Sequence, residues 1–229
     1  MVRWSAWLLQ KRQDLPQALD WLTPSEGKQL ARLQIEKRRH DWLLGRWTAK
    51  QALTRVAGKN LEGSCMVELE IRAAESGAPR AYFQDRRLDL VLSISHRQGA
   101  GLCAVAGEGA VGCDLEWIEP RSTAFVEDYL TDSEVAQVKA AEEGVTVLAN
   151  GIWSAKESVL KLRESGLRTD PRALRVESST GVISPIWHAF SVHIDGEGGV
   201  YKGWWRRFDK WVLTVATDPP AGPPEWAAP

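Results

Sequence analysis

Residues 22–26 (Leu-Thr-Pro-Ser-Glu) return 108 positions later as residues 130–134 (Leu-Thr-Asp-Ser-Glu), and this repeat gives the clearest indication of how the chain is organised. A second pair, residues 45–50 (Gly-Arg-Trp-Thr-Ala-Lys) and residues 151–156 (Gly-Ile-Trp-Ser-Ala-Lys), is offset by 106 positions. One short helix-start motif can recur by chance, but two pairs in nearly the same register favour a duplicated unit. In each copy, Thr-x-x-Glu precedes an apolar periodic run, which is the pattern of a capping box at a helix start.

The segments around the repeats predict helices packed beside antiparallel strands. Two helical stretches, about residues 36–57 and 147–164, contain the second repeated pair. Strand candidates are residues 66–73, 90–95, 101–107, 110–116, 186–194, 200–208 and 210–217. Runs of strands with segregated helices indicate the α+β class. We therefore predict two similar α+β lobes, residues 1–119 and 120–217, with the active site between them and an unpacked proline-rich tail at residues 218–229.

The composition describes an ordinary globular protein and excludes several classes of partner. Of the 229 residues, 44% are hydrophobic and 26% are charged, and the net charge of −1 provides no overall field that would attract nucleic acid or a membrane. No apolar run is long enough for a signal peptide or a membrane span. The three cysteines lack the spacing of a metal site, which favours a reducing, cytoplasmic location.

Two short segments point to the chemistry. In residues 112–116 (Gly-Cys-Asp-Leu-Glu), a strand would turn Asp114 and Glu116 to the same face, because side chains two apart share a face. In the helical segment 153–161 (Trp-Ser-Ala-Lys-Glu-Ser-Val-Leu-Lys), Glu157 and Lys161 lie one turn apart. If the two faces meet, three carboxylates and an ammonium converge, which is the layout of a magnesium-assisted phosphoryl-transfer site.

A plainer interpretation of the same residues stays open at this point. Two acids at alternate strand positions are usually a solvated face, and a Glu-Lys pair four apart on a helix is usually surface support worth a few tenths of a kcal/mol.

Both segments resemble signature motifs of the 4'-phosphopantetheinyl transferases, in the larger single-chain subclass. Those motifs read Gly-Val-Asp-Ile-Glu and Trp-x-x-Lys-Glu-(Ala/Ser)-x-x-Lys, in this order. Here Cys113 and Leu115 replace the usual Val and Ile, which are apolar exchanges on the opposite strand face. The resemblance covers about residues 36–161 and implies a pseudo-dimer of two α+β halves with coenzyme A between them. It also implies Mg²⁺ as cofactor and an apo acyl or peptidyl carrier protein as partner.

The resemblance also assigns two segments to coenzyme A. A Ser-x-Ser-His segment lies against its phosphate in the family, so Ser95 and His96 inherit that role, although a histidine at a strand end is more often a surface group. Residues 77–79 (Gly-Ala-Pro) are similar to the family's Gly-(Lys/Arg)-Pro turn, whose backbone lies along the adenine. Ala78 replaces the basic residue between Gly77 and Pro79, and Arg80 could compensate for the lost charge. A plain solvent turn explains this segment about equally well.

A basic cluster completes the nucleotide side of the predicted site. The family segments that resemble residues 36–46 hold arginines that bind the 3'-phosphate, for which the planar guanidinium is suited. Spacing does not decide between Arg38, Arg39, Arg46 and Lys50. We prefer Arg39 and Arg46, which are seven apart and share a helix face, while a solvated basic face is the alternative. In the second motif, Lys156 and Lys161 are also assigned to coenzyme A.

The predicted function is Mg²⁺-dependent transfer of the 4'-phosphopantetheine group from coenzyme A to a carrier-protein serine, with release of adenosine 3',5'-bisphosphate. Asp114, Glu116 and Glu157 would hold the metal, Glu157 or a water it shares with the metal would take the serine proton, and Lys161 would stabilise the leaving phosphate. One alternative is a catalytically silent module that binds coenzyme A or a carrier protein, although none of its acids or its lysine is lost. Another is an unrelated metal-dependent phosphoesterase. Because the repeat pairs two units within one chain, we expect a monomer.

Overall fold

The repeated segments take corresponding places, at the start of a short helix and within a long helix, in the computed structural model, which describes residues 4–57, 66–141, 144–178 and 183–227. In the N-terminal half, a sheet in the order β1–β6–β5 carries two helices and a smaller sheet of three strands. Its elements are β1 (Ser5–Lys11), η1 (Arg12–Asp14), α1 (Pro24–Arg32), α2 (Glu36–Ala57), η3 (Met66–Glu68), β2 (Leu69–Ala73), β3 (Pro79–Phe83), β4 (Arg86–Arg87), β5 (Val91–Arg97) and β6 (Ala100–Ala106).

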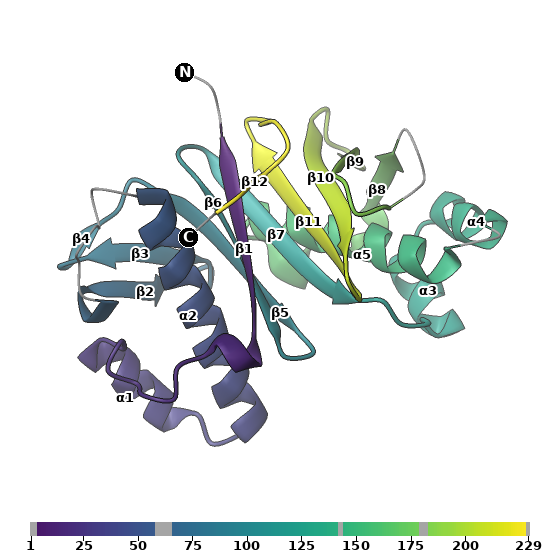
Figure 1. Cartoon of the computed structure of the whole chain (residues 1–229). Coiled ribbons are helices and arrows are strands. Elements are labelled where there is room, and N and C mark those ends of the chain that lie inside the picture. Colours follow the sequence, from purple (N-terminus) through teal and green to yellow (C-terminus); the bar gives the residue numbers. More distant parts are fainter. Residues whose placement is uncertain (1–3, 58–65, 142–143, 179–182, 228–229) are drawn as a thin grey trace.

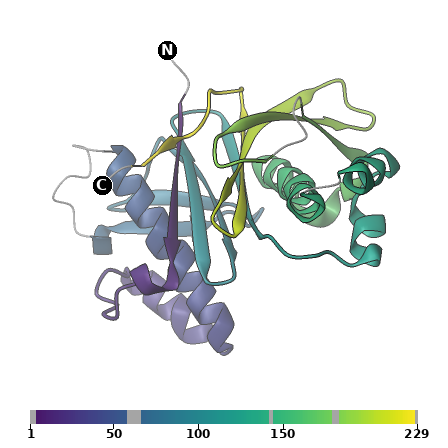
Figure 2. The same cartoon turned by 45° about the vertical axis from the view of Figure 1, so that its right-hand side comes forward.

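The C-terminal half repeats this strand order as β7–β11–β10 and extends it by two strands, β9 and β8. Its elements are β7 (Ala110–Trp117), α3 (Thr123–Tyr129), α4 (Asp132–Ala140), α5 (Val145–Leu162), η4 (Gly166–Arg168), η5 (Pro171–Ala173), β8 (Leu174–Ser178), β9 (His188–Ile194), β10 (Val200–Phe208) and β11 (Trp211–Asp218). The two halves lie side by side, purple to teal and teal to yellow in Figures 1 and 2. The α+β class is therefore confirmed.

Each repeated segment builds a buried ion pair with the same partners. Lys50 and Lys156 are fully buried, and each ammonium lies 2.6 Å from the capping-box glutamate of its own half, Glu26 or Glu134. The remaining contacts also correspond. Each lysine donates to two backbone carbonyls, Lys50 to those of Trp21 and Met66 and Lys156 to those of Tyr129 and Pro171. Each glutamate accepts from one strand amide, Glu26 from Ile71 and Glu134 from Val176. Each network ties a short helix, a long helix and a strand together.

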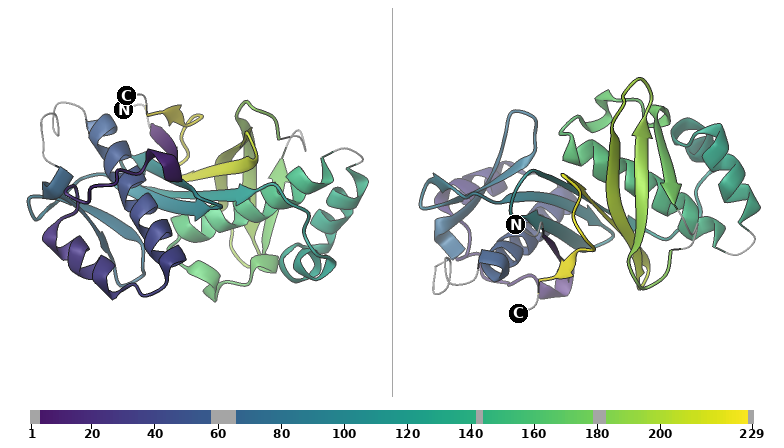
Figure 3. Two further views of the ribbon diagram at one scale, coloured as in Figure 1. Left: turned by 60° about the horizontal axis from the view of Figure 1, so that its bottom comes forward. Right: turned by 90° about the horizontal axis from the view of Figure 1, so that it is seen from above.

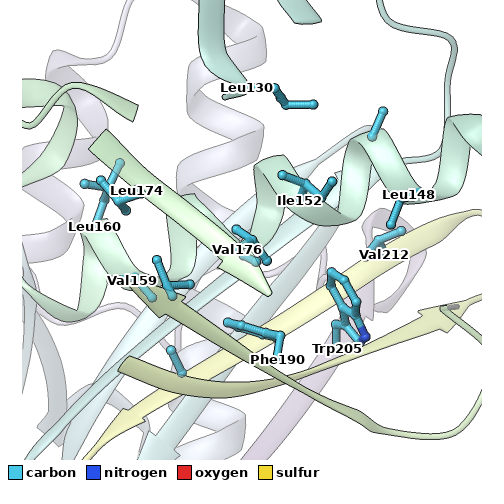
Figure 4. Close-up of a cluster of buried hydrophobic side chains, with 14 of the residues drawn as sticks. Leu130, Leu148, Ile152, Val159, Leu160, Leu174, Val176, Phe190, Trp205 and Val212 are labelled. Atoms are coloured by element: carbon cyan, nitrogen blue, oxygen red, sulfur yellow. The ribbon is translucent and has the colours of Figure 1, made fainter. Parts of the chain in front are cut away.

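Apolar side chains fill the space inside each half and between the halves. In the C-terminal core, Leu148, Ile152 and Val159 of α5 lie against Val176, Phe190 and Trp205 of the sheet (Figure 4). A corresponding cluster joins α2 to β1, β2 and β6. A third cluster, which we call the seam, packs β1 and β6 against β7 and β11 and includes Trp7, Leu102, Cys113 and Leu213.

The boundary between the halves differs from the predicted one. Strand β7 pairs with β11 along its whole length, from Ala110–Asp218 to Trp117–Trp211, so the strand with the acids belongs to the C-terminal sheet. The halves therefore separate at residues 107–109, between β6 and β7, and not near residue 119. The turn at 107–109 has the composition of a hairpin turn, and the choice of pairing partner is a long-range property that local sequence does not reveal.

The prediction of an unpacked tail is wrong. Residues 225–226 form β12 (Glu225–Trp226), which pairs parallel with β1, and the yellow segment crosses to the purple strand in Figure 3. The Ala227 amide donates to the Trp7 carbonyl at 2.9 Å, Ala227 is buried, and the Trp226 ring lies 4.4 Å from that of Trp7. Four of the five prolines of the tail lie within residues 219–224, before the hydrogen-bonded segment. In the described ranges, no helix combines the length and the apolar character that a membrane crossing requires.

Candidate active site

Strand β7 and helix α5 pack in direct backbone contact, and this contact positions the predicted acids. A methyl group at Gly112 would lie 1.8 Å from the Ser158 carbonyl oxygen and 2.5 Å from the Leu162 nitrogen. Only a glycine allows the strand to approach the helix this closely. The same strand face carries Asp114 and Glu116, so both carboxylates face α5. Cys113 and Leu115 lie on the other face, within the seam.

Asp114 is bonded to groups from two other elements. Its Oδ1 lies 2.6 Å from the Lys161 ammonium of α5 and accepts a hydrogen bond from the Ser95 hydroxyl of β5 at 2.8 Å. The same ammonium is 3.0 Å from the Ser95 hydroxyl. Burial is the largest single effect and opposes the charge of Lys161, but the attraction and hydrogen bond of Asp114, together with Cys113 and Glu157, outweigh it and raise the lysine pKa. The other oxygen of Asp114, Oδ2, is buried and has no hydrogen-bond partner among the described residues.

Glu116 is held by a different set of groups. One oxygen is 2.6 Å from the Arg121 guanidinium and 3.5 Å from that of Arg97, and the other accepts from the Trp153 indole at 3.0 Å. Asn150 of α5 in turn accepts from the Arg121 Nε at 2.6 Å. Burial raises the pKa of Glu116, and so does the charge of Asp114, against the opposing effect of Arg121.

Sequence reasoning missed Arg97 and Arg121. Arg97 lies at the end of β5, and Arg121 lies in the connection between β7 and α3. Because both reach Glu116 only through tertiary packing, no spacing along the sequence predicts these contacts. Trp153 packs against Phe125 and Tyr129, and its indole also donates to the carboxylate of Glu116.

Glu157 is the third acid of the cluster and is half-buried on α5. Burial raises its pKa to about 7, and the charges of Asp114 and Glu116 add to this effect while Lys161 opposes it. The three carboxylates are thus close enough to repel one another. However, the described part of the chain holds no ready-made cluster of three metal-ligating side chains. The predicted convergence on one point is modified in the structure, because Lys161 bonds Asp114 and Arg121 bonds Glu116.

The donor set still fits a divalent cation. The unpartnered, buried Oδ2 of Asp114 and the mutual repulsion of the acids are the features that a cation would relieve. Carboxylate oxygens are the ligands that Mg²⁺ prefers, and it usually takes only one or two of them from the protein. Asp114 and Glu157 are the better placed ligands, since both oxygens of Glu116 already have partners.

Two cavities share the predicted nucleotide turn, and one of them reaches this cluster through Lys161. One, of about 370 Å³, is lined by residues that include Arg38, Arg46 and His96. The other, of about 390 Å³, lies between the halves and includes Lys161 in its lining. Both are lined by Gly77 and Pro79, and Ala78 lines the second. The structure therefore brings the turn, the basic residue Arg46 and His96 to one place beside Lys161.

Arg46 has a feature that points to an anion. Its side chain lies against the Trp42 ring, 4.7 Å from the centroid, and its Nε is buried without a hydrogen-bond partner in the described residues. Burial lowers its pKa, against the attraction of Glu26. A buried cation with an unpartnered donor favours a negatively charged ligand.

Three residues assigned to coenzyme A lie elsewhere or have other partners. Arg39 donates to the Leu30 and Leu33 carbonyls at the end of α1 and does not line either cavity, where Arg38 stands in its place. The ammonium of Lys156 is enclosed in the C-terminal core, because its position on α5 is rotated about 100° from that of Glu157. It has no exposed surface that could contact a nucleotide. Ser95 reaches the site, but its hydroxyl binds Asp114 and Lys161.

Comparisons with known proteins agree with this geometry. Residues 110–216 match the model of the 4'-phosphopantetheinyl transferase superfamily. Among solved structures, the chain is similar to a holo-(acyl-carrier-protein) synthase from Bacillus anthracis crystallised in complex with CoA (3',5'-ADP). That match has 21% identity and a TM-score of 0.38, and it covers 44% of this chain and 92% of the synthase. No curated protein matches the chain. The superfamily match spans β7 and α5 with all three acids and Lys161, so the part of the chain that carries the candidate site is similar to the 4'-phosphopantetheinyl transferase superfamily.

Proposed function

We propose that the enzyme uses Mg²⁺ and transfers the phosphopantetheine arm of coenzyme A to a serine of an apo acyl or peptidyl carrier protein. The other product would be adenosine 3',5'-bisphosphate. The observation that carries the proposal is the cluster of Asp114, Lys161 and Ser95, where β7, α5 and β5 meet beside two cavities.

Coenzyme A would occupy these cavities with its nucleotide end toward α2. The turn at residues 77–79 offers backbone groups to the flat adenine, since a glycine there leaves no side chain in the way. Arg46 and Arg38 supply positive charge for the 3'-phosphate, and His96 can donate to a phosphate oxygen from the same cavity wall. The pyrophosphate would then lie toward Lys161.

Asp114 and Glu157 would hold Mg²⁺, with Glu116 as a third ligand if it exchanges one of its present partners. When bound, the ion would neutralise negative charge that develops on the phosphate oxygens.

The protein's own groups account for the proton and for the leaving phosphate. The serine oxygen of the carrier would form a bond to the β-phosphorus of coenzyme A while the bond to the bridging oxygen breaks. Glu157, or a water it shares with the metal, would accept the serine proton, and burial together with the negative charges of Asp114 and Glu116 favours proton uptake there. Lys161 would neutralise the departing adenosine bisphosphate, and Ser95 and Asp114 would hold its ammonium in place.

We further infer that the two halves form a pseudo-dimer with one active site at the seam, in a monomeric, cytoplasmic enzyme. The shared strand order and the two corresponding Lys–Glu networks support the pseudo-dimer.

Incubation with coenzyme A, Mg²⁺ and a panel of apo carrier proteins tests the function by mass spectrometry. We expect one carrier to gain one phosphopantetheine group, with an equal amount of adenosine 3',5'-bisphosphate, and a chelator to abolish both products. Asp114→Asn and Glu157→Gln should lose turnover by orders of magnitude and bind Mg²⁺ more weakly in calorimetry. Hydrolysis of coenzyme A without an acceptor would instead indicate a phosphoesterase, and binding without any product would indicate a silent module.

A further inference from the structure

A carboxylate just beyond the catalytic helix connects the two halves. Glu164, two residues after the end of α5, accepts a hydrogen bond from the Ser76 hydroxyl at 2.5 Å and forms an ion pair with Arg80. Ser76 and Arg80 stand on either side of the turn at residues 77–79. One side chain from the C-terminal half therefore holds both ends of the nucleotide turn in the N-terminal half.

The backbone of Glu164 is adapted to this contact. Its φ of 55° lies in the left-handed region, which is uncommon for a residue other than glycine. The conformation is fixed by two hydrogen bonds: the Glu164 amide donates to the Lys161 carbonyl at 3.1 Å, and Arg168 donates to the Glu164 carbonyl at 2.9 Å. Although burial alone would raise the pKa of Glu164, the hydrogen bonds from Ser76 and Arg80 hold it below its usual value.

The link lies within one helical turn of the catalytic lysine. Glu164 follows Lys161 by three residues, and both side chains line the same cavity of about 390 Å³ as Ser76 and Arg80. A shift of the nucleotide turn would therefore be transmitted to the end of α5 and to the Lys161 ammonium.

We propose that Glu164 is a positioning residue that holds the end of α5, where Lys161 lies, against residues 74–80, which include the nucleotide turn. Arg80 then serves this link and does not bind coenzyme A. The proposal rests on the proposed function. It revises the expectation that Arg80 replaces the positive charge missing at Ala78, because the charge of Arg80 is already balanced by Glu164.

A double-mutant cycle distinguishes the two roles of Arg80. We expect Glu164→Gln and Arg80→Met each to lower kcat about three- to tenfold and to leave the Kd for coenzyme A nearly unchanged. The double variant should lose no more kcat than either single variant. The charge exchange Arg80→Glu with Glu164→Arg should recover part of the lost kcat. If Arg80 instead binds the ligand, Arg80→Met would raise the Kd, Glu164→Gln would leave or lower it, and the exchange would recover nothing.

A matched control comes from the same end of the same helix. Glu197 binds Arg163 through both carboxylate oxygens at 2.8 Å, but entirely within the C-terminal half. Glu197→Gln should leave kcat unchanged. If it lowers kcat as much as Glu164→Gln does, the loss in Glu164→Gln comes from general loosening of α5 and not from the link to the nucleotide turn.

Hydrogen exchange tests the link independently of catalysis. Glu164→Gln should speed amide exchange both at residues 74–80 and at residues 161–164, whereas Glu197→Gln should leave residues 74–80 unaffected. Unchanged exchange at residues 74–80 in Glu164→Gln would overturn the proposal. An enzyme that transfers nothing to any carrier would refute the proposed function, and the exchange measurement would still decide whether the link exists.

Discussion

At the scale of single residues, two lysines five positions apart on α5 perform different tasks. Lys156 neutralises Glu134 in the core, whereas Lys161 is partly exposed and binds Asp114 in the site. We predict that Lys156→Met lowers the free energy of unfolding by about 3–5 kcal/mol, because it leaves a buried carboxylate without its partner. Lys50→Met should cost a similar amount, since Lys50 has the equivalent partner Glu26. Lys161→Met should instead reduce turnover at least about a hundredfold.

Chemical denaturation and the rate of carrier modification measure the two effects separately. A Lys156→Met variant that is stable but inactive would indicate that Lys156 acts on coenzyme A, as the family resemblance implies.

The residues that sequence located correctly at the junction of β7 and α5 are those fixed by local periodicity. A repeat of two along β7 puts Asp114 and Glu116 on one face, a repeat of four along α5 does the same for Glu157 and Lys161, and the packing of β7 on α5 then brings the two faces together. Arg121 could not be found this way, because its contact with Glu116 depends on the path of the chain between β7 and α3. Arg39 was misplaced for a related reason: the end of α1 lies beside it, and the carbonyls there take its guanidinium.

At the scale of elements, the packing of β7 on α5 determines the geometry of the site. We predict that Gly112→Ala lowers turnover at least about a hundredfold and also lowers the melting temperature, because its methyl group would push α5 away from Asp114. Gly198→Ala is the matched control, since a methyl group there meets nothing within 4 Å and the residue needs no left-handed backbone. Assays of both variants with the same carrier measure the effect. Normal activity of Gly112→Ala would show that the helix can shift without harm.

The elements with the clearest periodicity of apolar residues were predicted most accurately. The predicted helix at residues 36–57 coincides with α2, and the predicted helix at residues 147–164 is α5 displaced by two residues. Strand β1 was not predicted, because residues 5–9 are buried on both faces and show no alternation. Residues 66–68 alternate as a strand would but form the 3₁₀ turn η3.

At the scale of the whole molecule, the sequence predicted a duplication but did not indicate which strands and segments pair with one another. The repeat offsets predicted two similar lobes, and the equivalent Lys–Glu networks are consistent with this. The assignment of β7 and the path of the tail remained hidden, because each depends on a pairing partner about 100 or more residues away along the chain. Such pairings are selected by the global packing of apolar faces, which short motifs do not encode.

The same duplication predicts how many active sites the molecule has. At the positions equivalent to Glu157 and Lys161, the first copy carries Gln51 and Arg55, and Arg55 donates to the carbonyl of Ala227 in the C-terminal segment at 3.3 Å. Gln51 cannot provide a carboxylate, and the C-terminal segment engages the side chain that corresponds to Lys161. The seam already buries the face that two identical subunits would otherwise use to pair. We therefore predict a mass near 25.5 kDa in light scattering and one coenzyme A per chain in calorimetry. A stable dimer, or two equivalent nucleotide sites per chain, would contradict the single-seam arrangement.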